Sequence, residues 1–128
     1  MKKTFTGRVI HSQRVSAKAL KLSEGLNTLE SYLDNRRYLK GKIVCLPTTF
    51  GSTTGGMILQ TMIQEGNGPL AFLFTQEIDP LASAGIILAD IWNNKKVTVI
   101  DRIGDELLTA VRDGQRITVE ESGEIILN

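Results

Sequence analysis

The sequence is poor in several residue types, and each shortage excludes a class of protein. Its 128 residues contain a single cysteine, Cys45. One cysteine cannot build an internal disulfide framework or a self-contained four-thiolate metal or iron-sulfur site, because such sites need about four ligands. We therefore expect this chain to bind no metal ion and no cluster of its own.

Charge of one sign and long apolar runs are also scarce. The chain carries 15 basic and 14 acidic residues, and no run of like charge exceeds pairs such as Lys95–Lys96. A nucleic-acid partner is therefore not expected. The polar start lacks the ~7 to 15 apolar residues of a signal peptide, and no apolar stretch of ~20 residues follows, so we expect no membrane span and a cytoplasmic location.

What the chain does contain is a mixture of strand and helix patterns, which predicts one α/β domain over residues 1–128. Expected strands cover 4–10, 17–22, 42–46, 70–74, 97–100, 116–120 and 123–127. Expected helices cover 26–33, 57–65, 81–89 and 106–111. The continuous apolar run 70–74 indicates a strand covered on both faces, so part of the sheet should be parallel. Asp79 and Pro80 offer an N-cap and a first helical residue for a helix that is apolar almost all round and therefore buried.

The best candidate for chemistry is the segment Leu46–Gly56, in which a buried strand leads through small hydroxyl residues and glycines into a helix. Free backbone N–H groups at a helix N-terminus, together with the hydroxyl of Ser52, would suit a carboxylate or a phosphate. The alternative is that these residues only form a tight strand-to-helix turn.

Several short motifs, in order along nearly the whole chain, resemble the swivel domain of the aconitase X group. That group includes the small subunits of phosphomevalonate dehydratase-like enzymes. The family has a strand ending in Leu-Pro, then a loop Arg-Gly-Ser-x-x-Gly-Ser and a helix. The matching residues here are Leu46–Pro47 and Phe50–Gly56, followed by Gly68, Pro69, Ala71, Ala84–Ile86, Asp113–Gly114 and the strands at 119–125.

The resemblance implies a swivelling β/β/α domain, a mixed sheet or barrel flanked by short helices, that closes over an active site carried mostly by a larger partner subunit. Enzymes of this family dehydrate hydroxy acids such as cis-3-hydroxy-L-proline or (R)-5-phosphomevalonate. The large subunit holds an iron-sulfur cluster that removes the hydroxyl, and the small subunit's loop serine takes the proton. By position that serine is Ser52.

Neighbouring loop residues are predicted to assist Ser52. Gly51 and Gly55 would let the backbone approach the substrate, and Thr53 and Thr54 could donate hydrogen bonds to it. Backbone N–H groups at the start of the following helix would stabilise the serine alkoxide.

The loop departs from the family pattern at two positions: Phe50 replaces the arginine and Gly56 replaces the last serine. Phenylalanine cannot grip an anion, so either another group such as Arg102 or a partner residue takes that role, or the substrate is different. We lean toward a substrate without phosphate. A divergent, inactive swivel module is the remaining option.

Other residues are interpreted more plainly. We expect His11 to be solvated or locally hydrogen-bonded, and Cys45 to be a small buried hydrophobe. Met57 and Trp92 are expected to pack against the core, and the charged cluster around Asp101 to form a solvated turn.

Three hypotheses remain open at this stage. The chain is the catalytic small subunit of a two-component hydro-lyase, or an anion-binding module without chemistry, or an interaction domain whose loop packs on another chain. An isolated swivel domain should expose an apolar face meant for its large subunit, and such a face can drive homo-oligomer formation.

Overall fold

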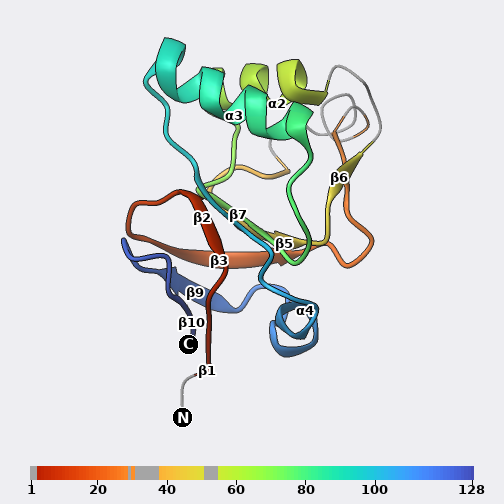
Figure 1. Ribbon diagram of the computed structural model, residues 1–128, viewed down its shortest axis with the longest axis vertical. Coiled ribbons are helices and arrows are strands. Elements are labelled where there is room, and N and C mark those ends of the chain that lie inside the picture. The colour runs from red at the N-terminus through yellow and green to blue at the C-terminus, as the bar shows by residue number, and fades with distance from the viewer. Residues whose placement is uncertain (1–2, 29, 31–37, 51–54) are drawn as a thin grey trace.

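The computed structural model describes residues 3–28, 30, 38–50 and 55–128 (Figure 1). Its strands are β1 Lys3–Phe5, β2 Arg8–His11, β3 Val15–Lys21, β4 Leu26–Asn27, β5 Ile43–Leu46, β6 Thr49–Phe50, β7 Ala71–Phe74, β8 Thr98–Asp101, β9 Arg116–Val119 and β10 Ile125–Leu127. Its helices are α2 Gly55–Gln64, α3 Pro80–Asn93 and α4 Glu106–Ala110. The predicted mixture of strands and short helices is confirmed.

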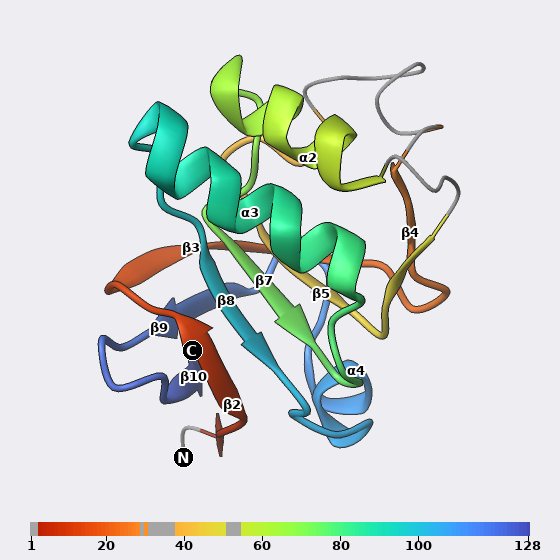
Figure 2. The same ribbon diagram turned by 45° about the horizontal axis from the view of Figure 1, so that its top comes forward.

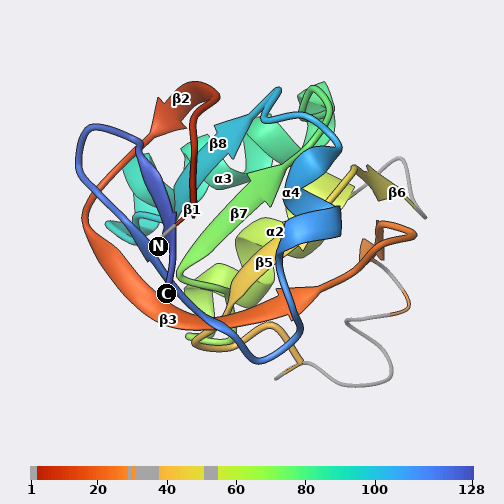
Figure 3. The same ribbon diagram turned by 90° about the horizontal axis from the view of Figure 1, so that it is seen from below.

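One curled sheet of eight strands runs in the order β1-β10-β9-β3-β5-β7-β8-β2, and β4 with β6 forms a small separate sheet (Figure 3). The centre, from β3 to β8, is parallel, and the remaining pairings in the large sheet are antiparallel. All four residues of β5, and all four of β7, are buried. Strands covered on both faces read as continuous apolar runs, so the expectation of a partly parallel sheet is confirmed.

Two apolar cores lie on opposite faces of this sheet. Helices α2 and α3 cover one face (Figure 2). Phe72 and Phe74 stack in the core on this face with ring centroids 5.6 Å apart. On the other face, Leu107 of α4 packs with residues of β5, β7, β9 and β10. Because β5, β7 and β8 are parallel, their carboxyl ends share one edge of the sheet, and the connections that leave this edge carry the candidate site.

The expected strand 4–10 is divided into two strands, which pair with different neighbours. β1 pairs with β10 and β2 pairs with β8. The strand is interrupted between Phe5 and Arg8. At Gly7, within this interruption, a Cβ atom would overlap the carbonyl oxygen of Asp101. The alternating pattern continues across this point, so the pattern alone could not show the division.

The expected helix at 26–33 is wrong at its start, because Leu26 lies in β4 and is hydrogen-bonded to the carbonyl of Thr48 at 3.0 Å. The side-chain oxygen of Asn27 accepts a hydrogen bond from the N–H of Glu30 at 3.0 Å. Leu29 and Leu33 lie outside the described residues. Pairing with a distant segment overrides local helical spacing here.

Helix α3 is not buried all round. Ala82, Ile86 and Ala89 face the core, but Ile91 is 68% exposed and Trp92 is 70% exposed. Met57 of α2 is 68% exposed as well, so neither Met57 nor Trp92 packs as predicted. The outer face of α3 is apolar without being covered. Within the described residues, no helix is both long and apolar enough to span a bilayer.

Candidate functional site

The predicted site segment is only partly described. Ser52, with Gly51, Thr53 and Thr54, lies outside the described residues, so its assigned role stays a prediction. Gly55 is the first residue of α2. The described chain does fix the two points between which the segment runs: Phe50 at the end of β6 and Gly55 at the start of α2.

The upstream point is held by the small sheet. β6 pairs in parallel with β4, with Leu26 opposite Thr49 and Asn27 opposite Phe50. The hydroxyl of Thr28 donates a hydrogen bond to the carbonyl of Phe50 at 3.3 Å. The backbone that enters the Ser52 segment is therefore tied to the chain around residues 26–28.

Thr49 also binds the start of α3. Its buried hydroxyl donates a hydrogen bond to Oδ2 of Asp79, and Oδ1 of the same carboxylate accepts the N–H of Ala82 at 2.9 Å. The second of these bonds is the predicted N-cap, which is confirmed. The first was not predicted, because no sequence signal connects a threonine of β6 with an N-cap residue 30 positions later.

The downstream point is held by two glycines. A Cβ atom on Gly56 would overlap the carbonyl oxygen of Leu81, and one on Gly85 would lie 2.6 Å from the carbonyl carbon of Gly56. Helices α2 and α3 therefore touch backbone to backbone near the start of α2, as their adjacent ends in Figure 2 show. This contact explains why a serine at position 56 has no room and why glycine stands there.

Phe50 stands where the family has an arginine, and it supplies no charge for binding an anion. Its side chain is half exposed, and its ring lies over Gly25, where an added Cβ atom would come within 3.1 Å of Cε1. Gly25 also has φ +93°, a conformation that favours glycine. The chain therefore presents an aromatic ring at the position where the family has its arginine.

A charged cluster lies at the carboxyl end of β8. Arg8 binds Asp101 through two hydrogen bonds of 2.8 and 2.6 Å, and the N–H of Ile78 donates to the same carboxylate at 2.9 Å. Burial would raise the pKa of Asp101, but the hydrogen bonds from Arg8 and Ile78 and the charges of Arg8 and Arg102 outweigh it, so the pKa is lowered. The predicted solvated turn is wrong for Asp101, which is fully buried.

Arg102 is the other basic residue of this cluster. It is about half exposed, and its guanidinium lies 3.2 Å from Glu77, which is also 3.8 Å from Arg8. Both arginines therefore already face carboxylates. An incoming anion would have to compete with Glu77 for Arg102.

Cys45 and His11 do not belong to the site. Burial raises the pKa of the Cys45 thiol to about 12, which makes it an unsuitable metal ligand or nucleophile. His11 lies with Nδ1 3.9 Å from Asp90 of α3. In residues 3–28, 30, 38–50 and 55–128, no three histidine, cysteine, aspartate or glutamate side chains group to hold a metal ion.

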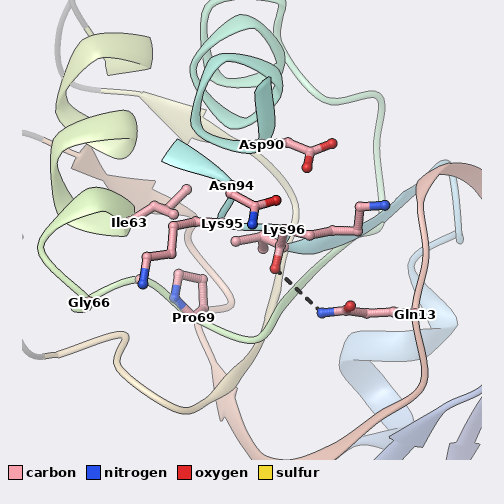
Figure 4. Close-up of a pocket in the computed structure, with 10 residues that line it drawn as sticks. Gln13, Ile63, Gly66, Pro69, Asp90, Asn94, Lys95 and Lys96 are labelled. Carbon is pink, nitrogen blue, oxygen red and sulfur yellow. Dashed lines mark hydrogen bonds between the residues drawn. The ribbon is translucent and has the colours of Figure 1, made fainter. Parts of the chain in front are cut away.

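A cleft of about 540 Å³ lies elsewhere, lined in part by Gln13, Gly66, Pro69, Lys95 and Lys96 (Figure 4). The side-chain amide of Gln13 reaches the carbonyl of Lys96 across it at 3.5 Å. Gly66 and Pro69 precede β7, and Lys96 precedes β8. The cleft therefore lies at the amino ends of these strands, at the edge opposite Thr49 and Asp79, and is not part of the candidate site.

Comparison with solved structures places the fold. Over 98% of both chains, the structure superposes on aconitase X from Thermococcus kodakaraensis in its holo form, with a TM-score of 0.78 at 18% identity. A UPF0107 protein solved by NMR gives the same TM-score at 19% identity, covering 98% of this chain and 99% of the other. The predicted swivel-type mixed α/β fold is confirmed.

Comparison with known sequences gives the family. The small subunit of phosphomevalonate dehydratase from Aeropyrum pernix is 31% identical over 85 residues, which are 66% of this chain and 59% of that protein. The small subunit from Methanocella arvoryzae is 25% identical over 88 residues, which are 69% of this chain and 61% of that protein. A sequence model of the aconitase X swivel domain matches residues 4–127. This chain therefore belongs to the aconitase X swivel-domain family.

Proposed function

We propose that this chain is the small subunit of a two-chain aconitase X-type dehydratase that removes water from a hydroxy carboxylic acid. The observation that carries the proposal is the position of the Ser52 segment, which joins β6 to the start of α2 in a chain matched to the family over residues 4–127. The names of both curated relatives support a small-subunit role. The matched stretches span about three fifths of those relatives, at 59% and 61%.

In this proposal Ser52 accepts the proton that is removed from the carbon next to the substrate carboxylate. The electrons of that C–H bond form the new C=C bond. The hydroxyl leaves the neighbouring carbon with the two electrons of the broken C–O bond. Serine needs its alkoxide stabilised for this task, and the unpaired first-turn N–H groups of a ten-residue helix such as α2 can supply that stabilisation.

Departure of the hydroxyl is assigned to the large subunit. The described part of this chain offers no metal-binding group, and its buried Cys45 does not fit a cluster ligand. A Lewis acid on the other chain would lower the barrier by accepting the hydroxyl's charge, so that neither subunit has to supply a strong catalyst alone. The reaction is then completed only when the two chains meet.

The substrate is proposed to carry a carboxylate and no phosphate. The support is Phe50 at the loop, together with the pairing of Arg8 and Arg102 to Asp101 and Glu77. The aromatic side chain of Phe50 packs more favourably against a compact ring or an apolar group of a substrate than against a phosphate. The names of the curated relatives favour phosphomevalonate instead, so both substrate types belong in the test.

The test is anaerobic co-expression with the large subunit, followed by dehydration assays on cis-3-hydroxy-L-proline and (R)-5-phosphomevalonate. A base of this kind contributes about 10²- to 10⁴-fold, so Ser52→Ala should lower kcat by that factor while the complex still forms. Ser122→Ala, in the exposed turn between β9 and β10, is the matched control and should keep full activity. Full activity in Ser52→Ala would instead favour a binding or interaction module.

A further inference from the structure

We infer that the outer face of α3 is the surface on which the large subunit docks, an inference that rests on the proposed function for the identity of the partner. This face is an apolar stripe in which residues recur every three or four positions along the helix. We call the set the α3 stripe: Leu81, Ala84, Ile87, Leu88, Ile91 and Trp92. The opposite side of the helix, with Ala82, Ile86 and Ala89, is buried in the core.

The first argument is the exposed area. The large exposed side chains of the stripe are between 37% and 70% exposed: Leu81, Ile87, Ile91 and Trp92. At about 200 Å² for a large side chain, they leave roughly 400–500 Å² of apolar surface open to water. The largest apolar patch on a monomer is about 300–600 Å² and is often functional. One side of a standard interface buries about 800 Å², of which about 56–65% is apolar, so the stripe supplies the apolar area that one docking surface needs.

The second argument is the scarcity of charge around the stripe. The ten residues of α2 include no charged residue, and the fourteen of α3 include only Asp90, although 23% of the whole chain is charged. Asp90 lies 3.9 Å from His11 of β2 and is not a member of the stripe. The centres of interfaces are depleted of charge and enriched in tryptophan and methionine, and Met57 of α2 is exposed as well. A partner that fits this surface is therefore apolar and uncharged at its centre.

The third argument is the place where the stripe begins. A Cβ atom on Gly56 would overlap the carbonyl oxygen of Leu81, so the first residue of the stripe adjoins the first turn of α2. The proposed reaction uses the first-turn N–H groups of α2 on one chain and a Lewis acid on the other, so the two chains must meet here. Because α2 and α3 form one outer layer of the molecule, an interface at the start of α2 continues along α3 (Figure 1). The large subunit is the partner that must reach this end of α3, which is why we assign the stripe to it and not to a second copy of this chain.

The experiment measures the affinity of this chain for the purified large subunit by isothermal titration calorimetry under anaerobic conditions. Trp92→Ala removes the chain's single tryptophan, and Ile91→Lys places a charge within the stripe. Gln64→Lys is the matched control, because it adds the same charge at an exposed position at the end of α2, outside the stripe. All three positions are exposed, so circular dichroism should show an unchanged fold in each variant.

We expect Trp92→Ala and Ile91→Lys each to raise the Kd about 30-fold or more, because one loses an aromatic anchor and the other buries a charge without a partner. Gln64→Lys should bind as tightly as the wild type. When the small subunit is saturating, kcat should match the wild type in every variant, because the stripe contacts none of the reacting atoms. An unchanged Kd in Trp92→Ala and Ile91→Lys, or an equal rise in Gln64→Lys, would overturn the inference.

Analytical ultracentrifugation of the chain alone tests the other occupant, a second copy. A wild-type dimer that Ile91→Lys dissociates, while the affinity for the large subunit is unchanged, would assign the stripe to a second copy and overturn the inference. Variant-sensitive binding of the large subunit without dehydration of either hydroxy acid would refute the proposed function and leave the docking surface standing. Dehydration by a complex that all variants form equally well would do the reverse, and a wild type that does not bind the large subunit would refute both.

Discussion

Gly85→Ala tests the backbone contact between α2 and α3, because two physical effects predict opposite signs for it. Alanine has the higher helix propensity, so on propensity alone the change should stabilise α3 by about 0.5–1 kcal/mol. The structure predicts the reverse. A Cβ atom at position 85 would lie 2.6 Å from the carbonyl carbon of Gly56 and would overlap its oxygen.

The size of the effect follows from how this overlap can be relieved. Ordinary carbon contacts are about 3.5–4.0 Å, so the helices must separate by roughly 1 Å near the start of α2. The obstructing atoms belong to the backbone of Gly56, so no side chain can rotate away. Overpacking of this kind costs about 1–3 kcal/mol and should outweigh the propensity gain. The net cost is then about 1 kcal/mol, and for a domain of this size we expect the Tm to fall by roughly 3–6 °C.

Thermal and urea unfolding, followed by circular dichroism, provide the assay. Ala84→Gly is the matched control, because Ala84 is the exposed neighbour on the same helix and reports propensity alone, at a cost of about 1 kcal/mol. A Gly85→Ala protein as stable as the wild type, or more stable, would refute the argument from overlap.

Two further predictions concern buried titratable groups. Asp101→Asn should destabilise the protein by about 2 kcal/mol at pH 7, because it breaks a charged pair with Arg8 that is buried on the aspartate side. Since the pKa of Asp101 is lowered by folding, its contribution is complete above the unfolded value of about 4 and is lost as the pH falls below it. Urea titrations from pH 7 to 2.5 should therefore show the gap between wild type and variant closing only below about pH 4, and a gap that stays constant would contradict the assignment. Cys45, with its pKa raised to about 12 by burial, should resist iodoacetamide at pH 8 in the native protein and react once urea unfolds it, as mass spectrometry can show; rapid native labelling would place the thiol at the surface.

The elements with strong local signals could be predicted from the sequence. The capped start of α3 at Asp79 and Pro80 is one case. β9 and β10, both predicted as strands, form an antiparallel pair that turns at Gly123, which has φ +95°. Caps, turns and alternation depend on residues within a few positions, so the sequence shows them directly.

The candidate site was predicted in part. The order of motifs led to the family, which the match over residues 4–127 confirms, and it selected the segment that contains Ser52. The supports of that segment were missed. Thr49 and Asp79 are 30 positions apart, and Gly56 and Gly85 look like ordinary small residues until two helices cross at them.

The sequence alone thus determined the class of fold, the positions of most strands and helices, and the family, since these depend on local periodicity and on motif order. Only the tertiary structure decided which side chains meet. Arg8 and Asp101 are 93 positions apart, and it is the curled sheet that brings them together and buries the carboxylate. It also left the outer face of α3 uncovered, because a helix that is apolar all round has only one side that the sheet can cover.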